Sequence, residues 1–149
     1  MTLIKSISGI RGTIGGQPGH NLTPADIVDC CAAFATWMLE QNKGNTVVIG
    51  RDARISGQLV NDLAVSTLKA MGMDVVNLGL STTPTVEMAV TLEIAAGGII
   101  LTASHNPRAW NALKFLNHRG EFISATAGAA ILEIIENQSF EFADLDRLG

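Results

Sequence analysis

Short runs of apolar, mainly β-branched residues alternate along this chain with longer segments whose apolar residues recur at helical spacing. A short apolar run bounded by turn residues is typical of a buried strand, and apolar residues three and four apart are typical of an amphipathic helix. Strands are predicted at residues 2–7, 46–50, 74–78 and 97–101, with a hairpin formed by residues 113–116 and 121–123. Because strands and helices alternate, we expect an α/β fold: a three-layer α/β/α domain with a mixed, mostly parallel sheet.

Four helices are predicted, and the first two begin with capping residues. Thr23, Pro24 and Asp26 supply an N-cap, a first-turn proline and an early acid, so a helix is expected from there to about residue 43. Ser56 is expected to cap the second helix, which ends at Gly72. The apolar face of that helix is expected to consist of Leu59, Leu63, Leu68 and Met71. The last two helices are expected at residues 84–92 and 125–137.

Two further segments are expected to carry no regular structure. Residues 8–21 are rich in glycine and are predicted as a loop, and residues 141–149 form an acidic tail. A chain of 149 residues fits one domain. We therefore expect a domain at residues 1–140 and the start of an interdomain linker at residues 141–149.

Composition argues against several classes of function. Ten Lys and Arg against fourteen Asp and Glu give a net charge of −4, so the chain has no long-range attraction for a nucleic-acid backbone. No apolar run approaches the ~20 residues of a membrane span, and the N-terminus lacks the layout of a signal peptide. A cytoplasmic protein with no membrane or nucleic-acid partner is therefore expected. Cys30 and Cys31 lie in an apolar, Ala-rich stretch and are expected to be buried, unpaired thiols.

The segment Thr-Ala-Ser-His-Asn-Pro at residues 102–107 directly follows a predicted buried strand. Ligands bind at the carboxyl ends of strands in such sheets, and Pro107 favours an extended conformation at Asn106. The hydroxyl, imidazole and amide groups gathered here suit an oxyanion or a phosphate ester on Ser104. A Ser-His hydrolase would need an acid to orient the histidine, and the glycines that flank such a serine are absent. Phosphate chemistry, a hydrolase and an ordinary polar loop all remain open from the residues alone.

The same string resembles the active-site serine loop of the α-D-phosphohexomutases, which interconvert sugar 1-phosphates and 6-phosphates. Further segments match that family in its own order and cover nearly the whole chain: residues 8–12, 49–57, 78–84 and 110–114. They contain Gly-Ile-Arg-Gly, Gly-Arg-Asp-Ala-Arg-Ile-Ser-Gly, Thr-Pro and Trp-Asn-Ala-Leu-Lys. Trp110 and Ala112 depart from the family's usual tyrosine and glycine.

This resemblance implies a phosphoserine enzyme. Ser104 would carry the phosphoryl group and present it to Mg²⁺, with a hexose 1,6-bisphosphate as activator. Arg11 would stabilise the transferring phosphoryl group with its planar, permanently charged fork. Lys114 is the candidate proton shuttle. His105 and Asn106 would orient the loop and bind substrate.

The family's enzymes have four domains, and this chain resembles the first alone. The resemblance implies a hexose or hexosamine phosphate as substrate, the remaining domains of the same enzyme as partners, and an isolated chain without activity. An oligomer is left open. The alternative is a non-catalytic sugar-phosphate-binding or interaction module that reuses the fold. Arg51, Asp52 and Arg54 are expected to form an ion-pair cluster that braces the serine loop.

Overall fold

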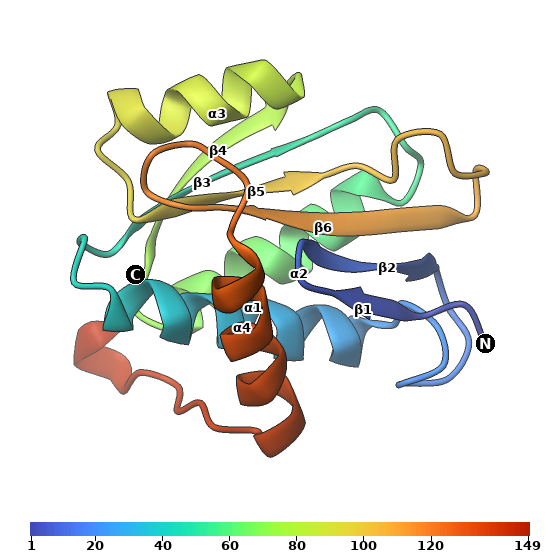
Figure 1. Ribbon diagram of the computed structural model, residues 1–149, viewed down its shortest axis with the longest axis horizontal. Helices are drawn as coiled ribbons and strands as arrows, with labels where there is room; N and C mark the ends of the chain where they lie inside the picture. Colours follow the sequence, from blue (N-terminus) through green and yellow to red (C-terminus); the bar gives the residue numbers. More distant parts are fainter.

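A six-stranded sheet with helices on both faces organises the chain, and the computed structural model describes all residues 1–149 (Figure 1). The strands are β1 (Ile4–Ser6), β2 (Gly9–Thr13), β3 (Thr46–Arg51), β4 (Asp74–Leu80), β5 (Gly97–Leu101) and β6 (Trp110–Leu116). The helices are α1 (Pro24–Glu40), α2 (Gly57–Ala70), α3 (Thr83–Leu92) and α4 (Ala125–Asn137). The expected three-layer α/β/α architecture is confirmed. None of the helices is both long and apolar enough to cross a lipid bilayer.

The sheet has the strand order β1-β2-β6-β5-β3-β4 and is mixed, as expected. Strands β2, β3, β4 and β5 point the same way, whereas β1 and β6 run against them. Because β6 lies between β2 and β5, only the pairs β5–β3 and β3–β4 are parallel. The carboxyl ends of β3 and β5 are therefore neighbours, and the loops that leave them meet at one edge of the sheet.

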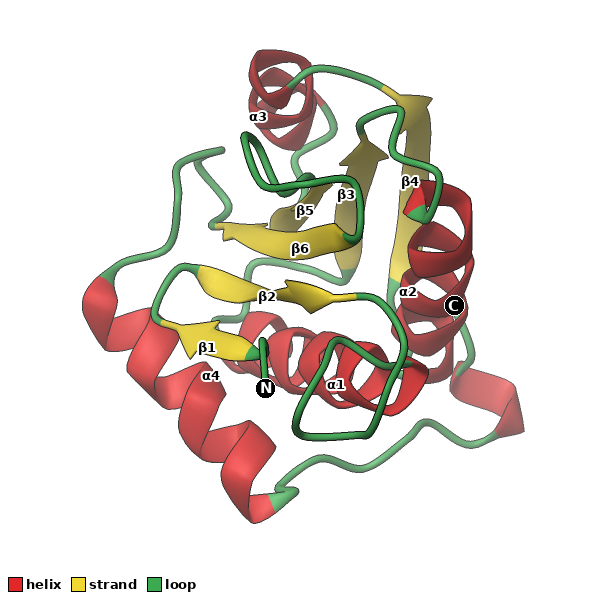
Figure 2. Ribbon diagram, turned by 90° about the vertical axis from the view of Figure 1, so that its right-hand side faces the viewer, coloured by secondary structure: helices red, strands yellow, loops and turns green.

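Two apolar layers hold the helices to the sheet. The larger lies under α1, α2 and α4, and in it the rings of Phe34 and Phe115 stack with centroids 4.3 Å apart. The smaller lies under α3 and includes Val48, Val86 and Ile100. Figure 2 shows α3 alone on its side of the sheet, over the β5 and β3 end. The neighbouring part of that face, formed by β2 and β6, carries the exposed Arg11.

The helix starts follow the capping prediction at α1 but not at α2. Thr23 and Asp26 form a reciprocal capping box, which buries and satisfies both side chains. Ser56 occupies the N-cap of α2 with helical backbone angles and makes no side-chain capping bond. Its hydroxyl instead accepts a hydrogen bond from Asn111 Nδ2 at 2.9 Å. Helix α1 ends at Glu40, before the predicted boundary.

The predicted apolar face of α2 was wrong in part. Leu59 is 52% exposed, and the buried residues of the helix are Gly57, Val60, Asn61, Ala64, Thr67 and Leu68. Val60, Ala64 and Leu68 recur every four residues, so the buried stripe is displaced from the leucines at 59 and 63. Helix α2 packs beside α1.

Strand β2 corrects the prediction of an irregular loop at residues 8–21. It is an inner strand, paired antiparallel to β1 and β6, and it buries Ile10. Gly9 has φ +145°, and a Cβ there would overlap the carbonyl oxygen of Leu113 in β6. The glycine that signalled a loop is thus required for close strand pairing.

Two smaller corrections concern the C-terminal part. Residues 121–123 form no strand, and the expected hairpin is reduced to one bridge between Leu116 and Phe122. The tail is not without structure, because Leu145–Arg147 forms a 3₁₀ helix. The amides of Ala143 and Gly149 donate to the carbonyls of Ala70 and Lys69, so the tail packs against the end of α2. Because these hydrogen bonds join backbone groups, they do not depend on residue type and could not be predicted from the sequence.

Candidate active site

Ser104 lies in the loop that joins β5 to β6. Its backbone has φ +53°, a left-handed conformation that is uncommon for a residue with a side chain. The Ser104 amide donates to Thr102 Oγ1 at 3.2 Å, and the amide of Asn106 donates to the carbonyl of Ala103 at 3.0 Å. The loop therefore turns back at once and holds the serine side chain outward, exposed at the strand end.

Lys114 reaches this serine from β6. It lies opposite Ile100 of β5 and Gly9 of β2, half-buried between two strands. Its Nζ donates a hydrogen bond to Ser104 Oγ at 2.8 Å. A nucleophilic hydroxyl and an amine within hydrogen-bond reach are the minimum needed for proton transfer at that oxygen.

Arg11 lies on β2 beside this pair. Its backbone pairs with Ala112, two residues before Lys114 and on the same face of β6. Arg11 and Lys114 line one depression of about 310 Å³, together with Ser6 and Ser8. Two cationic side chains thus border this depression, and one of them, Lys114, also reaches Ser104 Oγ. Ala112 has ordinary strand geometry, so it fits where the family has glycine.

His105 and Asn106 are placed by the same loop but outside that depression. His105 is exposed. Asn106 lines a second, open depression of about 490 Å³ with Arg54 and Arg108. The structure therefore brings Lys114 to Ser104, lines one depression with Lys114 and Arg11, and places Asn106 beside Arg54 and Arg108.

Arg54 braces the serine loop, as expected for the cluster at residues 51–54. Its guanidinium donates to four backbone carbonyls, those of Ser104, Asn106, Pro107 and Trp110, at 2.8–3.0 Å. Asp52 Oδ2 lies 3.4 Å from Arg54 Nε. Arg51 was wrongly included in this cluster, because its guanidinium binds Gln58 and the carbonyl of Asp52 and does not contact the loop.

Asn111 was not identified from the sequence as part of the site. It is fully buried and donates a hydrogen bond to Ser56, which joins the start of β6 to the start of α2. An amide side chain in the otherwise apolar segment Trp-Asn-Ala-Leu was the available signal, because a buried amide requires a polar partner.

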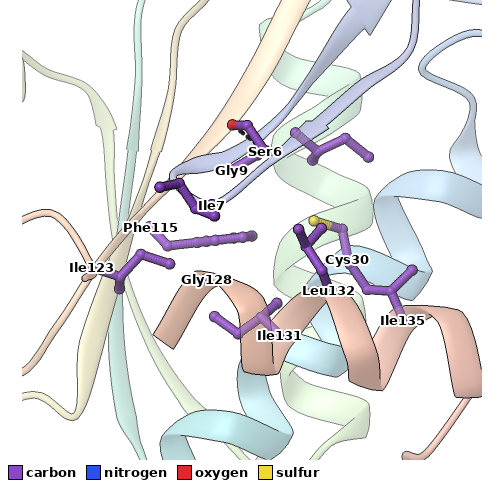
Figure 3. Close-up of a pocket in the computed structure, with 11 residues that line it drawn as sticks. Ser6, Ile7, Gly9, Cys30, Phe115, Ile123, Gly128, Ile131, Leu132 and Ile135 are labelled. Carbon is purple, nitrogen blue, oxygen red and sulfur yellow. Dashed lines mark hydrogen bonds between the residues drawn. The ribbon is translucent and has the colours of Figure 1, made fainter. Parts of the chain in front are cut away.

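A small apolar cavity lies on the opposite face of the sheet from these side chains. Figure 3 shows Phe115, Cys30 and residues of α4 around it, and its volume is about 10 Å³. That space is at the lower limit for one water molecule, so it is a packing gap and not a ligand site. Burial raises the pKa of Cys30 well above its usual value, with a further rise from neighbouring Cys31. Burial likewise raises the pKa of Cys31 to about 12.

No group of three or more His, Cys, Asp or Glu side chains gathers anywhere in the chain in an arrangement that could hold a metal ion. Near Ser104 the charged side chains are cationic apart from Asp52, which is engaged with Arg54. Such a setting fits an anionic phosphoryl group on the serine. Carboxylate ligands for a divalent cation are not supplied by these residues.

A family model and several known proteins match most of this chain. Residues 3–142 match the family model described as "Phosphoglucomutase/phosphomannomutase, alpha/beta/alpha domain I". A phosphoglucomutase/phosphomannomutase of Thermococcus kodakarensis is 32% identical over 141 residues, 93% of this chain and 31% of that protein. A phosphoglucosamine mutase of Alkaliphilus metalliredigens is 40% identical over 113 residues, 75% of this chain and 24% of that protein.

A solved structure shares the fold as well as the sequence. The crystal structure of a phosphoglucomutase/phosphomannomutase family protein from Burkholderia thailandensis has a TM-score of 0.79 and 27% identity. The match covers 94% of this chain and 31% of that one. The chain thus spans about a third or less of the length of these relatives.

Proposed function

The chain belongs to the phosphoglucomutase/phosphomannomutase family, and we propose that it is the phosphoserine-bearing domain of a phosphohexomutase. The observation that carries the proposal is the hydrogen bond from Lys114 Nζ to Ser104 Oγ at 2.8 Å. It supports phosphoryl transfer over the Ser-His hydrolase considered from the sequence, because the serine is paired with an amine and His105 is exposed.

In the proposed reaction a sugar hydroxyl oxygen attacks the phosphorus carried by Ser104. The new phosphorus–oxygen bond forms to the sugar as the bond to Ser104 Oγ breaks. Lys114 Nζ gives a proton to Ser104 Oγ, and the proton that the attacking hydroxyl loses returns Lys114 to its charged form. Lys114 holds a proton at Ser104 Oγ, where negative charge develops as that bond breaks. The resulting sugar bisphosphate returns its other phosphoryl group to Ser104, so the enzyme is unchanged and the phosphate has moved.

Arg11 stabilises the charge on the transferring group in this proposal. Positioning and electrostatic stabilisation supply most of the catalysis in phosphoryl transfer. Arg11 lies on the same open face as Lys114, and a guanidinium can bind two phosphoryl oxygens at once. Mg²⁺, if it binds at the phosphoryl group of Ser104, would neutralise part of that group's charge; this chain holds no cluster of carboxylates to complete such a site.

The experiment that tests the proposal maps the phosphoryl group. The complete gene product is incubated with glucose 1,6-bisphosphate. The phosphoryl group transferred to the protein, which is the label, is then located by peptide mass spectrometry. We expect the label on Ser104 and none in a Ser104→Ala variant, whereas a Ser124→Ala variant, altered at the cap of α4, should be labelled normally. A label on another residue, with Ser104 unmodified, would overturn the proposal. A binding module without transfer chemistry would take up no label.

We further propose that residues 1–149 fold alone but do not turn over a hexose or hexosamine phosphate. The strands, helices and apolar layers are complete within the chain, and domains of this length commonly fold independently. The chain holds no cluster of three or more His, Cys, Asp or Glu side chains that could bind a cation beside Ser104. A cooperative thermal melt together with no activity in a coupled assay with glucose 1-phosphate, Mg²⁺ and bisphosphate is the expected result. Turnover comparable to a whole mutase would contradict it.

A further inference from the structure

Arg54 makes contacts that connect the two elements bearing Ser104 and Lys114. Its Nη2 donates to the carbonyl oxygens of Ser104 at 3.0 Å and Asn106 at 2.8 Å. Its Nη1 donates to those of Pro107 at 2.9 Å and Trp110 at 3.0 Å. Trp110 is the first residue of β6, the strand that carries Lys114. One guanidinium therefore holds both the serine loop and the start of the lysine strand.

The contact to the Ser104 carbonyl acts on a strained residue. The left-handed conformation of Ser104 is strained for a residue with a side chain. Such strain persists only where the surroundings fix the backbone. The carbonyl of Ser104 meets a charged donor, and charge-assisted hydrogen bonds are stronger than neutral ones. Arg54 thus favours the backbone state in which Ser104 Oγ points to Lys114.

We propose that Arg54 is a positioning residue for phosphoryl transfer, which fixes the distance and direction between Ser104 Oγ and Lys114 Nζ. This inference rests on the proposed function. It assigns to Arg54 a role in the rate of transfer and not only in the stability of the fold. Positioning of this kind matters because a displacement of about 1 Å at the reacting atoms can lower a rate about 10²-fold.

Asp52 orients the guanidinium. Its Oδ1 accepts a hydrogen bond from the Arg54 amide at 3.1 Å, and its Oδ2 lies 3.4 Å from Arg54 Nε. The Arg54 side chain is 14% exposed, so it is held in one place between the loop after β3 and the serine loop. A lysine at position 54 could not replace it, because one ammonium cannot span carbonyls that bind to two separate nitrogens.

Arg51 provides a matched control on the same segment. Its Nη2 donates to Gln58 Oε1 at 2.9 Å and its Nη1 to the carbonyl of Asp52 at 3.2 Å, and no group of the serine loop accepts from it. An Arg51→Lys substitution makes the same chemical change three residues away without altering the contacts to the loop.

The experiment measures kcat, KM, the extent of Ser104 phosphorylation and the melting temperature in the complete gene product. We expect Arg54→Lys to lower kcat and the rate of Ser104 labelling about 10²-fold with KM unchanged, and Arg51→Lys to retain both rates. In an Arg54→Ala variant, added guanidinium at millimolar concentration should restore part of kcat. Sodium or ammonium chloride at the same ionic strength should not, since neither supplies a planar fork.

The outcomes separate this inference from the proposed function. A wild-type protein without label on Ser104 would defeat the proposed function itself. A labelled, active wild type together with an Arg54→Lys variant of equal kcat would defeat only the positioning role. So would a kcat that falls only in proportion to the folded fraction, without rescue by guanidinium. If Arg54→Lys is only partly folded, its kcat per folded molecule is compared with that of the wild type below the variant's melting temperature; equal values overturn the proposal.

Discussion

Lys114 and Ser104 are joined by a hydrogen bond of 2.8 Å between Nζ and Oγ, across the turn from β5 to β6. The antiparallel register sets this distance, because Lys114 lies opposite Ile100 and the loop after Leu101 folds back over it. The pair is therefore created by strand pairing and loop shape together. Its chemistry can be removed at either residue without altering the apolar layers.

Replacing Lys114 by methionine should leave the fold intact and lower turnover. Methionine keeps the length and apolar stem of the side chain but removes the proton-bearing group at Ser104 Oγ. We expect kcat to fall by about 10²–10⁴-fold, the range for loss of a general acid or base, and its pH dependence to change. Lys43→Met, in the exposed turn after α1, is the control. Equal kinetics for the two variants would return Lys114 to the class of solvated surface charges.

Replacing Arg11 by lysine tests the second cation. The charge is kept, but the planar fork that can bind two phosphoryl oxygens is lost. Turnover should fall by about 10²-fold, as for loss of one preorganised donor to a charged transition state. Because Arg11 is exposed, the free energy of unfolding should change by no more than about 0.5 kcal/mol. Arg119→Lys, at an exposed ion pair with Glu121, should alter neither quantity. Wild-type turnover in Arg11→Lys would contradict the role.

The buried parts of the fold could be predicted because their sequence pattern is local. The strand at Gly97–Leu101 is a continuous apolar run, and the helix at Ala125–Asn137 has the predicted bounds. Strand β2 could not be predicted, because its Gly9 is explained only by the backbone of β6 lying against it. That approach is a property of the sheet and not of residues 9–13.

Candidate residues for the site could be chosen from the sequence, but their arrangement could not be predicted. The motif around Ser104 resembles a known family, so Arg11 and Lys114 could be singled out before their positions were known. Arg54 was expected to brace the serine loop, but its individual contacts could not be predicted, because its partners are backbone carbonyls of residues 104–110, about fifty positions away. Every residue carries a backbone carbonyl, so the sequence does not indicate which carbonyls will lie close to Arg54.

The buried thiols predict a loss of stability at alkaline pH. Burial raises the pKa of Cys31 from 9.0 to about 12 and that of Cys30 well above its usual value. Above about pH 9 the unfolded chain releases thiol protons that the folded chain keeps, so unfolding becomes more favourable as pH rises. The free energy of unfolding should be unaffected by the thiols below that pH. Above about pH 9, each thiol should lower the free energy of unfolding by up to about 1.4 kcal/mol per pH unit.

Denaturant melts between pH 7 and 10 measure this effect. The chain contains no tyrosine, which removes one competing titration in that range. A double variant, Cys30→Ala with Cys31→Ala, should show a smaller decline above pH 9 than the wild type. The folded wild type should also resist a thiol reagent at pH 8 and react on unfolding. Parallel declines in both proteins, or rapid reaction of the folded chain, would contradict the burial of the two thiols.

Gly128 in α4 offers a test of how the β1–β2 turn is held. Helix propensity alone predicts that Gly128→Ala stabilises the protein by about 1 kcal/mol. The structure predicts the opposite, because a Cβ at Gly128 would overlap the backbone of Ile7, including its carbonyl. The turn would have to move away from α4, and overpacking of this kind costs typically about 1–3 kcal/mol. We therefore expect a lower melting temperature for Gly128→Ala.

The control is Ala129→Gly, one position along on the exposed side of the helix, which should lose only about 0.5–1 kcal/mol of stability through helix propensity. Since Arg11 lies on the strand that follows this turn, the Gly128 variant should also lose turnover, whereas the Ala129 variant should not. A Gly128→Ala protein as stable and as active as the wild type would show that the turn does not need glycine beneath it.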